Sequence, residues 1–286
     1  MGILLALASC ILIGVADVLL KKSFKDFPPS IAFFIFAIFS LLVWAPAGLL
    51  LGVQFDNVFL GLVVGVVSAI IGQALYIYVL EKGEVSITAT LLSSYSVYTI
   101  LFSMLFLGER PNTVTLMFIV LTVVGTIIVS LPERFDKKDL KHVPIILWGV
   151  AAAVAIGASD TLTKFYIDRT TVGSFLFYVS LAQIVVSFLY LRMDKQPLNQ
   201  FKDIVHHVGD YKLPLLGSLF LVLATMFLFL SFDFTLASIA SPIASSSPII
   251  TVALALIFLK EKITLKNWIG LTLVLLSLIA IGVVNG

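Results

Sequence analysis

The sequence predicts an all-α membrane protein with ten transmembrane helices in two inverted five-helix repeats. Three observations predict it: an extreme hydrophobicity, ten apolar runs of membrane-spanning length, and an internal repeat. Of the 286 residues, 60% are hydrophobic and only 12% are charged, whereas about 25% of the residues of a soluble protein are charged. A soluble fold of this length needs much more polar surface, so water-soluble enzymes and nucleic-acid-binding proteins are poor interpretations.

Net charge and reactive side chains exclude further classes. The net charge of +2 provides no basic field for nucleic acid, and the single cysteine, Cys10, cannot form an intramolecular disulfide. The apolar runs contain no histidine, and the sequence lacks G-x-S-x-G, H-E-x-x-H and a nucleotide-binding loop. We therefore expect no enzyme activity, no cofactor and no metal site.

The helices are placed by length. A membrane-crossing helix needs about 20 mainly apolar residues, whereas the strands of a membrane β-barrel alternate over about 10. The apolar runs are of the first kind and do not alternate. They lie near residues 2–20, 31–51, 58–80, 86–107, 112–131, 143–165, 171–192, 214–235, 238–259 and 265–284.

The chain repeats itself in two registers. The end of the first run, G-V-A-D-V-L-L-K from Gly14 to Lys21, matches G-A-S-D-T-L-T-K from Gly157 to Lys164 at an offset of 143. Further on, residues 78–100 match 230–252 at an offset of 152, and this register continues through an L-G-E-R sequence that matches L-K-E-K. The repeats are therefore predicted over 1–131 and 143–286, joined by a connecting loop at 132–142.

The odd number of helices in each repeat has a mechanical consequence. A half with five spans re-enters the membrane in the opposite sense, and inverted repeats are the architecture of many secondary transporters. Such repeats supply two nearly equivalent packings, one open to each side of the membrane. The repeat alone therefore indicates a transporter.

These features together resemble the EamA family of the drug/metabolite transporter superfamily. The resemblance covers nearly the whole chain and rests on the ten runs, the two repeats, the L-G-E-R and L-K-E-K turns and a ninth run rich in proline and serine. It implies alternating access through a central cavity lined by the first four helices of each repeat, with the fifth and tenth helices peripheral. It also implies a multi-pass protein of the cell membrane.

Two acids inside the runs are candidates for gating or coupling, because an ionisable group in a bilayer is costly. Asp17 and Asp160 are equivalent by the repeat, and each precedes a lysine by four residues, Lys21 and Lys164. This spacing places acid and base on one helix face. Either each pair is a salt bridge near the membrane interface, or it is a charged gate at one mouth of the cavity.

Asp233 is a third candidate, for proton coupling. It is equivalent to Glu81, but it stands between L-F-L-S-F and F-T-L-A-S with no lysine nearby. Glu81 is expected to lie at the membrane boundary. We expect Asp233 to be the less well solvated of the two acids.

The ninth run predicts a broken helix at the substrate site. Pro242 and Pro248 each remove a helical hydrogen bond, and neighbouring serines can satisfy the freed carbonyls. Broken helices near the bilayer midplane are where transporters bind substrates. The predicted substrate-binding residues are Gln73, Tyr76, Thr90, Ser94, Tyr95, Gln183, Ser241, Ser245 and Ser246. Close packing of small residues is the alternative interpretation of the serines.

The expected partners are a small-molecule substrate and the lipid bilayer, with protons as the candidate coupling ion, and the protein is expected as a monomer or a homodimer. The substrate is expected to be an organic metabolite or drug-like solute, such as an amino acid or amphipathic compound. A flippase for lipids or lipid-linked sugars is the alternative. Loop lysines and arginines place both termini outside the cytoplasm, whereas the family resemblance places both inside, so the orientation stays open.

Overall fold

A computed structural model describes residues 1–55, 57–110, 112–130, 143–197, 200–260 and 263–285, and all regular elements in these ranges are helices. The predicted connecting loop at 132–142 lies outside the described residues. Three segments of the described part of the chain are π-helical turns, labelled η. The first half contains α1 (Gly2–Ser23), α2 (Pro29–Leu51), α3 (Val58–Val67), η1 (Ser68–Ala74), α4 (Leu75–Lys82), α5 (Val85–Ser93), α6 (Tyr95–Phe102), η2 (Ser103–Leu107) and α7 (Thr113–Ser130).

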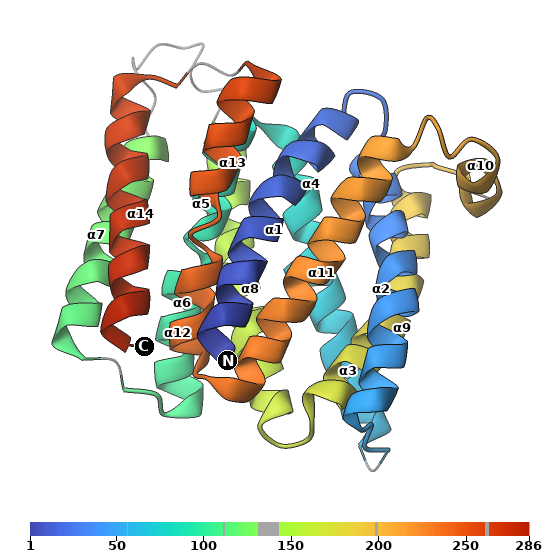
Figure 1. The fold of residues 1–286 in the computed structure, drawn as a ribbon, viewed down its shortest axis with the longest axis horizontal. Coiled ribbons are helices and arrows are strands. Elements are labelled where there is room, and N and C mark those ends of the chain that lie inside the picture. Colours follow the sequence, from blue (N-terminus) through green and yellow to red (C-terminus); the bar gives the residue numbers. More distant parts are fainter. Residues whose placement is uncertain (56, 111, 131–142, 198–199, 261–262, 286) are drawn as a thin grey trace.

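The second half follows the same plan, with one short extra helix in its longest connection. It contains α8 (Val143–Ile167), α9 (Val172–Met193), α10 (Gln200–His206), α11 (Lys212–Phe234), α12 (Ala237–Ala244), α13 (Pro248–Leu254), η4 (Ala255–Leu259) and α14 (Leu265–Asn285). The extra helix is α10. It lies outside the bundle, at the end opposite the two termini (Figure 1).

Within the described ranges, eight helical stretches are long and apolar enough to cross a membrane. They are Gly2–Ser23, Pro29–Leu51, Val58–Lys82, Val85–Leu107, Pro144–Ile167, Val172–Met193, Lys212–Phe234 and Ala237–Leu259. The predicted fifth and tenth spans correspond to α7 and α14, whose most apolar parts are shorter, at Thr113–Thr122 and Leu265–Ala280. The structure therefore supports an all-helical membrane protein with eight candidate spans and two shorter apolar helices.

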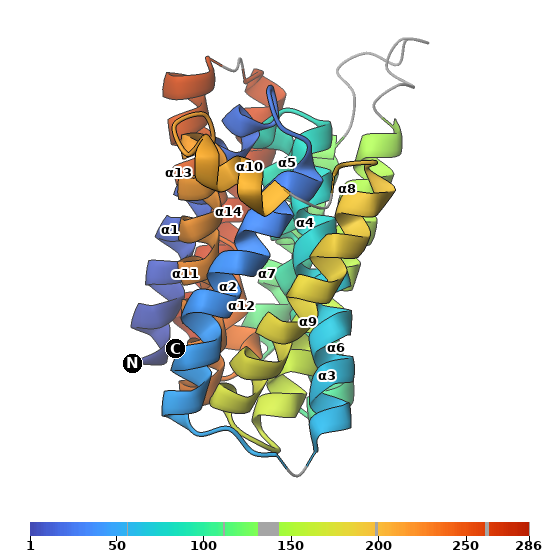
Figure 2. The same cartoon turned by 90° about the vertical axis from the view of Figure 1, so that its right-hand side faces the viewer.

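Helices of the two halves run in opposite directions. We call the end drawn at the top of Figure 1 the upper end and the end that carries both termini the lower end. The first helix, α1, runs from the lower to the upper end, whereas its counterpart α8 enters at the upper end and finishes at the lower end (Figures 1 and 2). The pairs α1 with α11, α2 with α9 and α7 with α14 each join one half to the other, and α7 and α14 form one edge of the molecule (Figure 1).

Glycines let these pairs approach closely. A Cβ on Gly48 of α2 would lie 2.6 Å from the carbonyl oxygen of Gly173 on α9, and one on Gly125 of α7 would lie 2.9 Å from the carbonyl oxygen of Gly270 on α14. Small residues at such crossings are the usual basis of helix association in membranes, where the hydrophobic effect does not drive it. Backbone contact therefore holds the two halves together.

The fourth and ninth spans end in the same way, at the start of the L-G-E-R and L-K-E-K sequences. Both end in a π-helical turn, η2 and η4, followed by a residue in the left-handed conformation. That residue is Gly108 in the first half, with φ 70°, and Lys260 in the second, with φ 56°. A left-handed backbone costs a residue with a Cβ about 1–2 kcal/mol, and only the first repeat avoids this cost.

We predict that Lys260→Gly stabilises the protein by about 1 kcal/mol. Glycine removes the steric cost of the left-handed backbone, and the larger conformational entropy that glycine loses on folding offsets only part of this gain. The matched variant Gly108→Ala should destabilise it by a similar amount. Unfolding of the detergent-solubilised protein by dodecyl sulfate measures both. Stabilisation by Gly108→Ala, or destabilisation by Lys260→Gly, would contradict this account of the turn.

Candidate functional site

The ninth span is broken near its middle, at three consecutive serines, Ser245, Ser246 and Ser247. The helix α12 ends at Ala244, and α13 begins at Pro248 after a turn. Pro242 lies inside α12, and the hydroxyls of Ser245 and Ser246 both donate to its carbonyl oxygen, each at 3.0 Å. Side-chain hydroxyls therefore supply donors to a carbonyl at the break, as a helix in a bilayer requires.

The fourth span is broken at the equivalent position without a proline. The helix α5 ends at Ser93 and α6 begins at Tyr95, so Ser94 stands between them, 152 residues before Ser246. The Ser93 hydroxyl donates to the Thr90 carbonyl oxygen at 2.8 Å, and the Ser94 hydroxyl donates to the Leu91 carbonyl oxygen at 2.7 Å. Serine back-bonding of this kind weakens the helical ladder, and this is the local cause that we assign to the second break.

Asp17 is fully buried and is held by two hydroxyl groups. The Tyr76 hydroxyl on α4 donates to Oδ1 of Asp17 at 2.5 Å, and the Thr251 hydroxyl on α13 donates to Oδ2 at 3.1 Å. Tyr76 belongs to the same half of the chain as Asp17, whereas Thr251 belongs to the other half. Both carboxylate oxygens therefore have donors, and the aspartate joins three helices.

Asp160 repeats part of this arrangement in the second half. Only 5% of it is exposed, and its Oδ2 accepts a hydrogen bond of 2.9 Å from the Ser241 hydroxyl on α12. The Thr99 hydroxyl on α6 donates to the Tyr95 carbonyl oxygen at 3.2 Å. Ser241 lies in the same half as Asp160, and Thr99 lies in the other. Thr99 and Thr251 are themselves equivalent at the offset of 152, although neither is among the residues that the sequence analysis singled out.

Two glycines bring the aspartate helices against the broken spans. A Cβ on Gly14 of α1 would lie 2.5 Å from Cβ of Ile250, and one on Gly157 of α8 would lie 2.6 Å from Cβ of Tyr98. Gly14 and Gly157 are equivalent in the repeat, as are Tyr98 and Ile250. The same close crossing is thus built twice, three residues before each aspartate.

The two lysines one turn further on bind the ends of neighbouring helices. The Lys21 ammonium donates to the carbonyl oxygens of Leu80 and Glu81 at 3.2 and 2.7 Å. The Lys164 ammonium donates to the carbonyl oxygen of Phe232 at 2.7 Å and to the carboxylate of Asp168, also at 2.7 Å. Cations are favourable at the carbonyl-rich end of a helix, so these lysines stabilise the ends of α4 and α11.

The premise that Asp233 is a poorly solvated acid is wrong. Its side chain is exposed one residue before the end of α11. Hydropathy of the flanking residues could not reveal this exposure, because the exposure of Asp233 depends on where α11 ends and on which face of the helix the side chain lies. Asp17 and Asp160 are the acids that the fold buries.

The predicted substrate-binding residues do not all converge. Tyr76 lies beside Asp17, and the Tyr95 hydroxyl is 3.5 Å from the Ser241 carbonyl oxygen, near Asp160. Gln183 lies instead between α9 and α2, where it accepts a hydrogen bond from Ser40. Buried hydroxyls of the remaining serines and threonines donate to carbonyl oxygens three or four residues earlier in the chain. These residues are Thr90, Ser94, Ser245 and Ser246.

Gln73 stands apart because its amide oxygen is buried and has no hydrogen-bond partner among the described residues. It lies in η1, a π-helical turn that the equivalent part of α11 lacks. Beside it, a Cβ on Gly72 would lie 2.9 Å from the Ser159 hydroxyl oxygen. Such π-helical turns are frequent at functional sites, and an unpaired buried amide has free capacity for a ligand.

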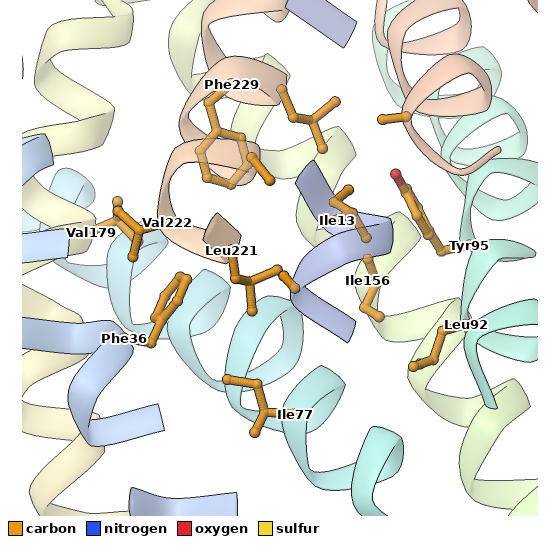
Figure 3. Close-up of a cluster of buried hydrophobic side chains, with 14 of the residues drawn as sticks. Ile13, Phe36, Ile77, Leu92, Tyr95, Ile156, Val179, Leu221, Val222 and Phe229 are labelled. Atoms are coloured by element: carbon orange, nitrogen blue, oxygen red, sulfur yellow. The ribbon is translucent and has the colours of Figure 1, made fainter. Parts of the chain in front are cut away.

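Apolar side chains from both halves form a large buried cluster. Figure 3 shows Ile13, Ile156, Leu92 and Tyr95, from α1, α8, α5 and α6, gathered on one side of it. Trp44 belongs to the same cluster, and its indole N–H donates to the Val222 carbonyl oxygen at 3.0 Å. Residues from both halves thus share one core.

Comparison with known proteins gives a consistent classification. The sequence model described as the EamA-like transporter family matches residues 1–131 and again 143–283. The uncharacterized protein MJ1333.1 of Methanocaldococcus jannaschii is 26% identical over 143 residues, which span 97% of that protein but 49% of this chain. A solved structure described as "Crystal structure of protein" has a TM-score of 0.64 and 15% identity over 97% of each chain, which is a likeness of fold.

We predict that Gly14→Ala and Gly157→Ala each destabilise the protein by about 1–3 kcal/mol, because the new methyl group overlaps a neighbouring helix. Gly209→Ala, in a loop with no heavy atom within 4 Å of the new Cβ, is the control and should change stability by less than about 0.5 kcal/mol. Thermal unfolding in detergent measures all three. Equal stability of all three variants would contradict the close crossings.

Proposed function

Because the chain belongs to the EamA-like transporter family, we propose that it is a secondary transporter that moves a small organic solute across the cell membrane by alternating access. In this proposal α7 and α14 are the peripheral fifth and tenth spans of two inverted five-helix repeats, over 1–131 and 143–286. The transporter acts as a monomer or a homodimer.

The observation that carries the proposal is the pair of equivalent buried aspartates, each bound to a hydroxyl of one of the two halves of the broken ninth span. An acid inside a membrane span is functional by default, because its burial is expensive. Here both acids lie where α1 and α8 cross the broken spans, which is where transporters of this architecture bind substrates and coupling ions. Protons are the coupling ion that two carboxylates with hydroxyl partners suit best.

The substrate class follows from the side chains near the breaks. Tyr76, Tyr95 and Ser241 offer neutral hydrogen-bonding groups beside two carboxylates. Gln73, three residues before Tyr76, adds an unpaired amide oxygen. These hydrogen-bonding groups and carboxylates favour a solute with one amino group and an apolar body, such as an amino acid or an amphipathic amine. It is unfavourable to multiply charged anions, which the carboxylates would repel.

A lipid or lipid-linked-sugar flippase on the same fold is not favoured. The groove between α6, η2 and α8 has a volume of about 310 Å³ and is lined by Phe102, Phe106, Ala158, Thr161, Leu162 and Phe165. Of these six residues only Thr161 is polar, and its hydroxyl already donates to the Gly157 carbonyl oxygen at 2.9 Å. A polar headgroup would find no path of donors or charges along this groove.

We predict that purified protein in liposomes carries amino acids or cationic amphipathic amines in exchange for protons, so that added solute collapses an imposed pH gradient. Asp17→Asn and Asp160→Asn should each slow this exchange by about tenfold or more, because hydrogen bonds to a charged acceptor are worth about 1.5–3 kcal/mol. Asp233→Asn is the matched control and should retain the exchange, because Asp233 is exposed.

Each other outcome has a defined meaning for this assay. Solute uptake without collapse of the pH gradient would leave a transporter and remove proton coupling. Loss of activity only in Asp233→Asn would return the coupling role to that residue. Transport of fluorescent lipid in place of the solutes would favour the flippase.

A further inference from the structure

We propose that the groove between α6, η2 and α8 binds one anionic phospholipid, with an acyl chain along the apolar walls and the phosphate at Arg169. The lipid is a resident ligand and not a transported one, so the site goes beyond the proposed function and does not depend on it. The lack of free polar groups along the groove, which disfavours passage of a headgroup, suits a chain that stays in place.

The walls of the groove have the surface that an acyl chain requires. The groove has a volume of about 310 Å³, and five of the six residues that line it are apolar. The sixth, Thr161, is buried and donates its hydroxyl to a carbonyl oxygen of its own helix. Phe106 is 71% exposed, so the groove is open on the side of η2. Inside a membrane a chain is held by van der Waals contact, and walls on two helices supply more of it than one helix face.

The length of the groove matches one leaflet of a bilayer. Its residues on α8 extend from Ala158 to Phe165, which are nine and two residues before Ile167, the last residue of that helix. The groove therefore begins about 3 Å and ends about 14 Å from the lower end of α8. The hydrocarbon of one leaflet is about 15 Å deep, half of the bilayer value of about 30 Å. A lipid of the lower leaflet thus places its acyl chain along the groove.

Arg169 provides a cation where the headgroup of such a lipid lies. It belongs to the connection after α8, which Figures 1 and 2 show at the lower end of the bundle. Its guanidinium carbon lies 3.5 Å from the ring centroid of Phe165, a wall of the groove, and one N–H donates to the Phe165 carbonyl oxygen at 3.3 Å. A guanidinium has five N–H donors in a planar fork that matches a phosphate, so most of them remain for a ligand.

The charge of Arg169 is not balanced by a carboxylate in the part of the chain that the structure describes. The neighbouring Asp168 lies 2.7 Å from the Lys164 ammonium, and Arg169 is exposed and has no such ion pair there. Arginines and lysines at the ends of membrane helices attract anionic lipids. The combination of an apolar groove and an unbalanced arginine at its mouth is therefore complementary to a phospholipid with a net negative charge.

The internal repeat shows that the fold itself does not require this arginine. At the offset of 143, the counterpart of Phe165 is Lys22 and the counterpart of Arg169 is Asp26. The upper end therefore has an acid where the lower end has the stacked arginine. The lipid site is a property of the second half and not of the duplicated frame.

The test counts lipids on the purified, delipidated protein by native mass spectrometry, with phosphatidylglycerol and phosphatidylcholine of identical acyl chains. The unmodified protein should bind one phosphatidylglycerol with about a fivefold preference, as expected for one basic residue at an anionic lipid. Arg169→Gln should lower phosphatidylglycerol binding to the level of phosphatidylcholine. The control Arg192→Gln, at an exposed arginine in the last turn of α9, should keep the preference. Equal binding of both lipids by the unmodified protein, or an unchanged preference in Arg169→Gln, would overturn the proposal.

A second pair of variants tests whether the acyl chain lies in the groove. Phe106→Ala should weaken binding of both lipids by about threefold, because the chain loses its contacts with the ring. Phe258→Ala is the matched control, since Phe258 is the counterpart of Phe106 at the offset of 152 and is 61% exposed, and it should weaken neither. Both rings are exposed, so neither change should disturb folding. Equal effects of the two variants would overturn the assignment of the chain to this groove.

Other occupants give different results in the same experiment. Glycerol phosphate carries the headgroup charge without acyl chains and should not displace phosphatidylglycerol at equal concentration; displacement would make the ligand a free phosphate ester. A dimer that forms only when lipid is lost would assign the groove to a second copy of the chain. Either result would overturn the lipid site.

The lipid site and the proposed function can fail separately, because the binding measurement contains no transported solute. Selective phosphatidylglycerol binding without solute transport in liposomes would leave the lipid site standing and remove the proposed substrate class. Proton-linked transport by a protein with no lipid preference would leave the transporter and remove the lipid site.

Discussion

The structure depends on one constraint: a polar group inside the hydrocarbon of a bilayer must find its hydrogen-bond partner within the protein. Serine and threonine hydroxyls in the spans meet it locally, by donating to carbonyl oxygens three or four residues earlier, as Ser187 and Thr225 do. A carboxylate cannot meet it in this way, because it only accepts. Asp17 and Asp160 must therefore recruit donors from other helices, and those donors organise the centre of the molecule.

This constraint makes the contacts between the halves specific. Close packing at Gly48 and Gly173 brings backbones together, but packing alone tolerates small slides of one helix along another. A carboxylate that must be met by a hydroxyl of another helix sets the register of α1 against α13 and of α8 against α12. Hydrogen-bonded polar groups in an apolar surround are well suited to this role, since a misplaced partner leaves a costly unsatisfied group.

The internal repeat produces a shared set of contacts in both halves, and the residues that differ between the halves lie near the broken spans. Both halves share the glycine crossing, the buried aspartate, the lysine at a helix end and the left-handed residue after the broken span. Only the first half has the π-helical turn that carries Gln73, and only the second has prolines at its broken span. Duplication explains the shared frame, whereas the asymmetric residues are the ones available to recognise a particular solute.

The sequence by itself determined the class of protein, the places of the helices, the two repeats and the equivalence of Asp17 with Asp160, because each of these is a property of local composition or of self-similarity. Even the turn at Gly108 and Lys260 was visible as a repeated motif. The tertiary structure alone decided which hydroxyls meet the aspartates, that Lys21 and Lys164 bind helix ends, that Asp233 is exposed and that the fourth span breaks at Ser94 without a proline. The physical reason is that a partner for a buried polar group is chosen by helix rotation and depth, and these are set by packing across the whole bundle rather than by neighbours in the chain.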